Sequence, residues 1–217
     1  MFTIMIGKQK GGVAGTTVTR EVAVAAAADG VRVVLVDLDP QGTLTSWWNR
    51  RTADAEEGHN PALAEADPAH LAAKLDELRP LFDLALLDAP PSVHSYFGEV
   101  MKLANLVLVP TGPTTDDLDA LPPVLDTIEA ANKPFAFVVT KAPTGRSSRL
   151  LDDAVALLAQ RGRVCPPMRW RQDYQVAPAT GGTGFEVRRS KATEEVAAIW
   201  EWVRKASKIK TRKRVSS

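Results

Sequence analysis

The chain has few cysteines and few histidines, and each shortage excludes a class of protein. Cys165 is the single cysteine among 217 residues, so an intramolecular disulfide and a disulfide-stabilised secreted fold are excluded. We expect Cys165 to be a buried residue at a strand end rather than a nucleophile. The histidines lack the spacing of metal ligands, so a histidine metal site is not expected; they are His59, His70 and His94.

Long apolar runs are also missing. None reaches transmembrane length, and the first residues lack the basic segment and long apolar core of a signal peptide. We therefore expect a cytoplasmic protein without a membrane partner. The composition is 45% hydrophobic and 24% charged, which is ordinary for a globular protein with one large core.

Apolar segments alternate with helical patterns along the chain. Predicted strands cover residues 2–6, 32–37, 83–88, 105–110, 134–140 and 163–168. Predicted helices cover residues 15–29, 42–50, 67–79, 93–103, 115–132, 147–161 and 190–206. This order predicts a single-domain α/β fold, a doubly wound, mostly parallel sheet with helices on both faces. Residues 51–68 show no strong period and are predicted to form a surface excursion.

A glycine-rich segment lies between the first predicted strand and an alanine-rich predicted helix. It reads Lys10-Gly11-Gly12-Val13-Ala14-Gly15-Thr16-Thr17. A strand, a glycine-rich loop and a helix N-terminus turn successive backbone N–H groups toward a bound phosphate. The phosphate-loop pattern has lysine at the position of Gly15, directly before the hydroxyl residue that holds magnesium. The segment predicts a nucleotide site in a fold of the P-loop NTPase type, with one phosphate-binding charge missing.

Two more predicted strands end in acidic segments, Asp37-Leu38-Asp39-Pro40-Gln41 and Asp88-Ala89-Pro90-Pro91-Ser92. In a parallel sheet, acids at the carboxyl ends of strands collect beside the phosphate loop, where they can hold hydrated magnesium and orient a water. The alternative is structural: a helix cap at the first segment and a strand end before a turn at the second. Three such segments in this order favour the nucleotide site.

Together the three segments resemble the deviant Walker A, Walker A′ and Walker B motifs of the ParA/MinD family of ATPases. The resemblance extends over residues 2–203 and is closest to small ParA proteins that lack an N-terminal DNA-binding domain. Residues 107–117 resemble the family's fourth strand and following loop. Residues 137–141 resemble the strand whose end approaches the adenine, and residues 174–186 the late loop that covers the base.

The resemblance implies ATP and Mg²⁺ as cofactors and assigns roles to residues of this chain. Lys10 would reach across an ATP-bound dimer to the partner's phosphates, and Asp39 would position the attacking water. The implied metal ligands are Thr16, Asp37 and Asp88. The implied nucleotide-binding residues are Gly11, Gly12, Val13, Ala14, Gly15, Thr16, Thr17 and Lys141.

This chain departs from the family pattern at two positions, because Ala14 and Gly15 stand where these proteins usually have glycine and lysine. Phosphoryl transfer depends on positioning and charge stabilisation, so we expect weak or impaired hydrolysis. Nucleotide binding should persist, since the backbone N–H groups, magnesium and Lys10 remain. Lys8 is an additional cation beside the loop, and we expect it to be solvated rather than to replace the missing lysine.

Positive charge is concentrated at the end of the chain. Residues 204–217 contain seven basic residues and no acid, which leaves a charge of about −6 on the rest of a chain of net charge +1. We expect residues 1–206 to form the nucleotide-binding domain and residues 207–217 a basic tail. A basic tail on an acidic body suits a polyanion such as DNA, and the predicted DNA-binding residues are Lys208, Lys210, Arg212, Lys213 and Arg214. The alternative is a solubilising tail without a ligand.

The resemblance implies an ATP-dependent sandwich dimer that binds non-specific DNA on the nucleoid. Through a ParB-like or other adaptor it would position a plasmid, a chromosome region or a protein cargo. The alternative is a nucleotide-sensing scaffold that does not hydrolyse ATP and acts through protein partners. A metabolic P-loop enzyme is a third hypothesis, but the sequence offers no additional catalytic groups for it.

Overall fold

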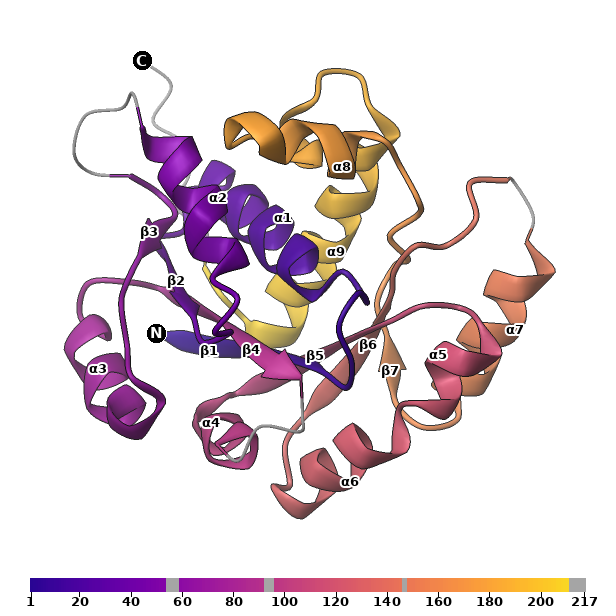
Figure 1. Ribbon diagram of the computed structural model, residues 1–217, viewed down its shortest axis with the longest axis horizontal. Coiled ribbons are helices and arrows are strands. Elements are labelled where there is room, and N and C mark those ends of the chain that lie inside the picture. The colour runs from indigo at the N-terminus through magenta and orange to yellow at the C-terminus, as the bar shows by residue number, and fades with distance from the viewer. Residues whose placement is uncertain (54–58, 92–95, 146–147, 211–217) are drawn as a thin grey trace.

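The computed structural model describes residues 1–53, 59–91, 96–145 and 148–210, which form a three-layer α/β structure (Figure 1). The central sheet has the strand order β3-β2-β4-β1-β5-β6-β7. Every pair of neighbouring strands in it is parallel. The predicted fold class, a doubly wound parallel sheet, is confirmed.

The strands follow the apolar segments of the sequence because a parallel sheet is covered on both faces and selects continuous apolar runs. Their bounds are β1 Phe2–Lys8, β2 Val33–Asp37, β3 Ala62–Leu63, β4 Leu84–Pro91, β5 Leu106–Thr111, β6 Phe135–Val139 and β7 Arg163–Val164. The prediction of a surface excursion over residues 51–68 is wrong at β3, which pairs with β2 at the sheet edge. Two residues are too few to show a strand period.

The predicted helices occur in the predicted order, with residues 93–95 and 147 of them outside the described residues, whereas α8, η2 and η3 were not predicted. Their bounds are α1 Gly15–Ala28, α2 Thr43–Thr52, α3 Leu71–Leu78, α4 Phe97–Leu103, α5 Thr115–Asp119, α6 Pro122–Ala130, α7 Arg149–Ala159, α8 Asp173–Val176 and α9 Lys191–Ser207, with 3₁₀ turns η1 Pro68–His70, η2 Ala177–Thr180 and η3 Gly184–Glu186. The predicted helix 115–132 is divided into α5 and α6. The reason is that Pro122 and Pro123 have no N–H to continue a helix and are tolerated only in a first turn.

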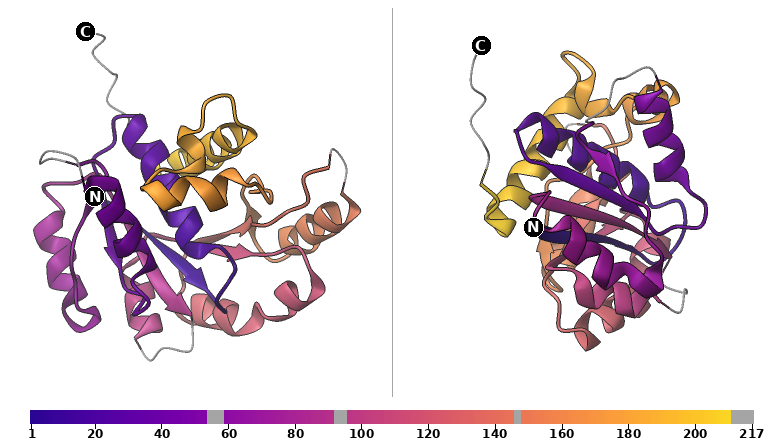
Figure 2. Two further views of the ribbon diagram at one scale, coloured as in Figure 1. Left: turned by 45° about the horizontal axis from the view of Figure 1, so that its top comes forward. Right: turned by 90° about the vertical axis from the view of Figure 1, so that its left-hand side faces the viewer.

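Each face of the sheet has its own core, because successive strand side chains point to opposite faces. Ile4, Leu35 and Leu86 pack with α1, α2 and α9 on one face. Met5 and Leu87 pack with α3, α4, α6 and α7 on the other. Figures 1 and 2 show these two helix layers on either side of the strands.

The later part of the chain returns to the first face of the sheet. Helix α9 buries Val196, Ile199 and Val203, and Trp200 Nε1 donates a hydrogen bond to Asp29 Oδ2 at 3.0 Å. Cys165 directly follows β7 and is buried, as expected, and burial raises the pKa of its thiol to about 12. Within the described residues, no helix has the length and apolar character needed to span a membrane.

Candidate functional site

The carboxyl ends of the neighbouring strands β1, β2 and β4 lie side by side. In the register of the sheet, Asp88 of β4 lies beside both Ile6 of β1 and Asp37 of β2. The segments that follow these strands, together with residues after β6 and β7, line a cleft of about 380 Å³, a size suited to a small ligand. Its lining residues are Lys8, Gly11, Gly12, Ala14, Gly15, Thr16, Thr17, Asp39, Gln41, Thr43, Pro91, Lys141, Trp170 and Gln175.

The glycine-rich loop forms one wall of this cleft and leads into α1. Gly12 and Ala14 have positive φ angles of 81° and 60°, a conformation that turns the loop sharply into the helix. Ala14 has no polar side chain to cap α1, so the first N–H groups of the helix are available to an anion beside Gly15 and Thr16. The loop is anchored from behind, because Thr140 Oγ1 donates to the Val13 carbonyl at 3.0 Å.

Asp88 lies fully buried beneath the cleft. Thr16 Oγ1 donates to one carboxylate oxygen at 2.6 Å, and Thr19 Oγ1 donates to the other at 3.1 Å. Burial raises the pKa of Asp88, whereas the positive charge of Lys8 and the hydrogen bond from Thr16 act to lower it. The structure therefore brings together the predicted hydroxyl and carboxylate of a magnesium site.

Lys8 differs from its expected place. The residue is only 6% exposed, so the prediction of a solvated lysine is wrong. The ammonium group lies 3.1 Å from Asp39 Oδ2 and 3.5 Å from Asp88 Oδ1. Strand β1 continues through Lys8, and the two carboxylates at the adjacent strand ends hold its charge inside the cleft. The sequence contained both acids, but their distance from Lys8 depends on the sheet register.

Asp37 makes the contacts of a helix cap. Its Oδ2 accepts hydrogen bonds from Thr45 N at 2.8 Å and Thr45 Oγ1 at 3.0 Å, and its Oδ1 accepts from Asp39 N at 3.2 Å. These contacts agree with the structural alternative and hold the first turn of α2 against the strand end. The predicted role of Asp37 in a magnesium shell stays a prediction.

The donor set fits magnesium that retains most of its water. In the part of the chain that the structure describes, no three His, Cys, Asp or Glu side chains are grouped to hold a metal by themselves. Magnesium in nucleotide sites usually takes one or two protein oxygens and completes its shell with phosphates and water. Thr16 and Asp88 provide such oxygens, and bound magnesium would neutralise phosphate charge.

The side chain of Lys10, at the start of the glycine-rich segment, points away from the cleft. Its ammonium group is 2.9 Å from Asp117 Oδ1 and donates to the Asp116 carbonyl at 3.2 Å, at the start of α5. Burial acts to raise the pKa of Asp117, but the hydrogen bonds from Lys10 and Thr114 outweigh it and hold this pKa below its usual value. Lys10 is 40% exposed and is not among the cleft-lining residues.

The opposite wall of the cleft is formed by Lys141, Trp170 and Gln175. Lys141 Nζ lies 5.6 Å from the ring centroid of Trp170, which is 53% exposed. Of the predicted base-covering residues 174–186, Gln175 lines the cleft. Further along, Gly184 and Phe185 donate their N–H groups to Glu21 of α1. Trp170 was not predicted to line the site, because the short polar segment around it shows neither a helical nor a strand period.

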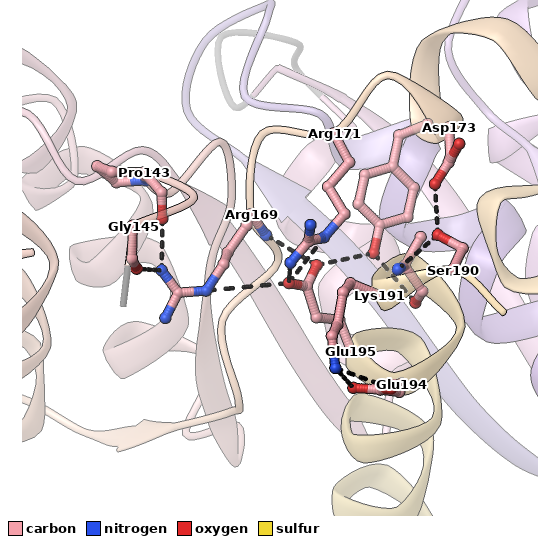
Figure 3. Close-up of polar contacts among 11 residues, drawn as sticks. Pro143, Gly145, Arg169, Arg171, Asp173, Ser190, Lys191, Glu194 and Glu195 are labelled. Carbon is pink, nitrogen blue, oxygen red and sulfur yellow. Dashed lines mark hydrogen bonds and ion pairs between the residues drawn. The ribbon is translucent and has the colours of Figure 1, made fainter. Parts of the chain in front are cut away.

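Polar contacts hold the segment that carries Trp170 against α9 (Figure 3). Arg171 Nε donates to Glu195 Oε1 at 3.0 Å, and the Tyr174 hydroxyl donates to Glu195 Oε2 at 3.1 Å. Arg169 donates to the carbonyls of Pro143 and Gly145 in the loop after β6. The wall of the cleft is therefore tied to both α9 and the loop that carries Lys141.

A parallel sheet with a glycine-rich turn after β1 and acids at the ends of β2 and β4 defines a nucleotide-binding α/β protein. Comparison with known families agrees with this class. Residues 4–183 match the family described as CobQ/CobB/MinD/ParA nucleotide binding domain, and the chain belongs to that family. The resemblance to the ParA/MinD family is thereby confirmed.

Individual relatives add detail. The chain is 33% identical over 137 residues to the maintenance of carboxysome distribution protein A of Halothiobacillus neapolitanus, covering 61% of this chain and 60% of that protein. It is 33% identical over 155 residues to the chromosome-partitioning ATPase Soj of Thermus thermophilus, covering 58% and 61%. The chain thus spans about three fifths of the length of these curated relatives.

Solved structures show the same fold. An ATP complex of a variant of McdA from Cyanothece matches with a TM-score of 0.80 at 19% identity, covering 98% of both chains. The cell division ATPase MinD of Pyrococcus furiosus matches with a TM-score of 0.77 at 20% identity, covering 94% of this chain and 99% of that one.

Proposed function

We propose that this protein is a ParA-type ATPase that binds ATP with Mg²⁺ in the cleft and positions an intracellular cargo. The observation that carries the proposal is the pairing of Thr16 with buried Asp88 at 2.6 Å beside the glycine-rich start of α1. A helix N-terminus attracts phosphate, and a hydroxyl with a carboxylate suits the magnesium that accompanies it. Asp39, which lines the same cleft, would orient the attacking water.

ATP would join two copies of the chain through Lys10. The side chain of this lysine is 40% exposed and contacts Asp116 and Asp117 rather than its own cleft, an arrangement that supports a role toward the phosphates of a second copy. Asp37 would complete the outer magnesium shell. Hydrolysis would be weak because Gly15 offers no charge from the usual loop position.

The cargo would be recruited through an adaptor of the ParB type while the dimer binds DNA of the nucleoid. Support comes from relatives named for carboxysome distribution and for chromosome partitioning. The described cations of the tail, Lys208 and Lys210, are exposed beyond α9. Arg212, Lys213 and Arg214 lie outside the described residues and remain predicted DNA contacts.

Size exclusion with light scattering tests the dimer. With saturating ATP and magnesium, the mass should change from monomer to dimer, whereas ADP should leave a monomer. Lys10→Ala should abolish the change. Lys102→Ala is the matched control, since Lys102 is an exposed lysine paired with Glu99 on α4. A monomer at saturating ATP, with nucleotide binding verified by calorimetry, would remove the sandwich dimer from the proposal.

The second candidate is a scaffold that binds ATP without hydrolysing it, and the glycine at position 15 favours it. Phosphate release separates the two. Release that exceeds the rate of Asp39→Ala supports the ATPase. Dimerisation on ATP with release equal to that variant supports the scaffold.

A further inference from the structure

The floor of the cleft contains a buried lysine that comes from β1 rather than from the glycine-rich loop. Lys8 is 6% exposed, lines the cleft and is shared between Asp39 at 3.1 Å and Asp88 at 3.5 Å. Burying an ammonium group is costly unless its charge has a use or a partner. Lys8 has partners in Asp39 and Asp88, and its position beside the start of α1 suggests a use in binding phosphate.

The missing side chain at position 15 and the path of Lys8 depend on each other. A Cβ built on Gly15 would lie 2.9 Å from Lys8 Cδ and 3.6 Å from Lys8 Cε. The aliphatic stem of Lys8 therefore occupies the space that a side chain at position 15 would need. A lysine at position 15 and Lys8 in its present path are mutually exclusive.

We propose that Lys8 supplies the phosphate-binding positive charge of this cleft from β1. It would take the role of the lysine that the phosphate-loop pattern has at the position of Gly15. The inference rests on the proposed nucleotide site. In the described structure Lys8 is held by Asp39 and Asp88, so its charge is already inside the cleft before an anion binds. The ligand chemistry is the β- and γ-phosphates of a nucleoside triphosphate, the groups that a lysine contacts in a phosphate loop.

Calorimetric titration with MgATP tests this role directly. Lys8→Met keeps an unbranched stem and removes the charge, and it should weaken ATP binding roughly ten- to a hundredfold, the effect of losing one charge-assisted hydrogen bond. Lys191→Met, which removes an exposed charge paired with Glu194 on α9, should bind ATP like the wild type.

A double-mutant cycle tests whether position 15 affects ATP binding through the path of Lys8. Gly15→Ala retains Lys8 but displaces its stem, so ATP affinity should fall. In a Lys8→Ala background the same Gly15→Ala change should have little further effect, because the stem it displaces is absent. The variant Lys8→Ala/Gly15→Lys should regain affinity to within about threefold of wild type, since it returns the charge to the usual position.

The outcomes distinguish this inference from the proposed function. If wild type binds MgATP and folded Lys8→Met binds it equally well, Lys8 is a counterion only and the inference is wrong, whereas the proposed function stands. If wild type does not bind MgATP, both fail. If Lys8→Met does not fold, Lys8→Gln decides, because it keeps a polar side chain without the charge: undiminished ATP affinity in that folded variant would overturn the inference.

Discussion

Glu21 on α1 is a buried carboxylate with backbone partners far away in the sequence. It is 1% exposed and accepts N–H hydrogen bonds from Gly184 at 2.8 Å and Phe185 at 2.9 Å. Burial raises the pKa of Glu21 to about 7, although these hydrogen bonds act to lower it. One side chain therefore couples the middle of α1 to the segment around Gly184 and Phe185.

This pKa predicts a pH dependence of stability. Between pH 4.5 and 7 the unfolded chain has lost the Glu21 proton while the folded chain retains it. The free energy of unfolding should therefore fall as pH rises through this window, by up to about 3 kcal/mol from Glu21, and then level off. Urea unfolding of wild type and Glu21→Gln at several pH values measures the contribution.

Glu194→Gln is the control for that experiment, because Glu194 is an exposed carboxylate on α9. Its pH profile should match wild type, whereas the profile of Glu21→Gln should be flatter between pH 4.5 and 7. Equal slopes in all three proteins would show that Glu21 titrates normally in the fold.

At the scale of elements, α2 is fastened to the segment from η2 to η3. Trp47 Nε1 donates to the Gly182 carbonyl at 3.0 Å, and Arg50 Nε donates to the Pro178 carbonyl at 3.1 Å. Arg51 forms an ion pair with Glu186 at 2.8 Å. These three interactions hold the segment from η2 to η3, which follows the cleft residue Gln175, against α2.

Gly181 allows this close approach. Its φ is 76°, and a Cβ there would lie 2.3 Å from Arg51 Cα, a contact between backbones that cannot be relieved by rotating a side chain. Gly181→Ala should lower the free energy of unfolding by about 3 kcal/mol or more, since it combines a strained φ with overpacking. Chemical denaturation provides the measurement.

Gly42→Ala is the matched control for backbone strain alone. Gly42 has a φ of 59°, but a Cβ there meets no atom within 4 Å. The expected loss is about 1 kcal/mol, the ordinary cost of a left-handed non-glycine residue. If the free energy of unfolding falls by a similar amount at both positions, the backbone at the contact between α2 and Gly181 can move apart without a loss of stability.

On the scale of the whole molecule, charge is separated between an acidic body and a basic end. Arg204 and Lys205 of α9 are paired with Glu201, and the cations of the tail within the described residues are Lys208 and Lys210. Ile209 packs against the core on the α9 face, which means that truncation at Lys208 would also disturb packing. Substitution is therefore the cleaner test of DNA binding.

Replacing the five predicted DNA-binding cations by glutamine should weaken binding to unrelated duplexes. The log–log slope of affinity against salt should become shallower by about 0.9 for each phosphate that the variant no longer neutralises. Fluorescence anisotropy at several salt concentrations, with and without ATP, measures both quantities. ATP should strengthen binding by wild type if a dimer presents two basic ends.

The control carries five glutamines at exposed cations elsewhere and should retain the wild-type slope. Identical affinities for the tail variant and this control would exclude the tail as the DNA-binding segment. The control positions are Arg79, Lys102, Arg149, Arg161 and Lys191.

The sequence by itself determined the α/β class, the order of the strands other than β3 and of the helices other than α8, and the strand ends that hold the site. These follow from local signals: apolar runs of strand length, helical periods, and glycine or acidic residues where a strand ends. Thr16 and Asp88 were therefore recognisable before their hydrogen bond was known.

Only the tertiary structure decided the contacts made between distant strand ends. Lys8 meets Asp88, 80 residues away, because β1 and β4 are neighbours in the sheet, and it fits there because Gly15 has no side chain. Likewise β3 exists through its pairing with β2, and Trp170 reaches the cleft because Glu195 holds the adjoining Arg171. Such contacts depend on register and packing, which no local pattern specifies.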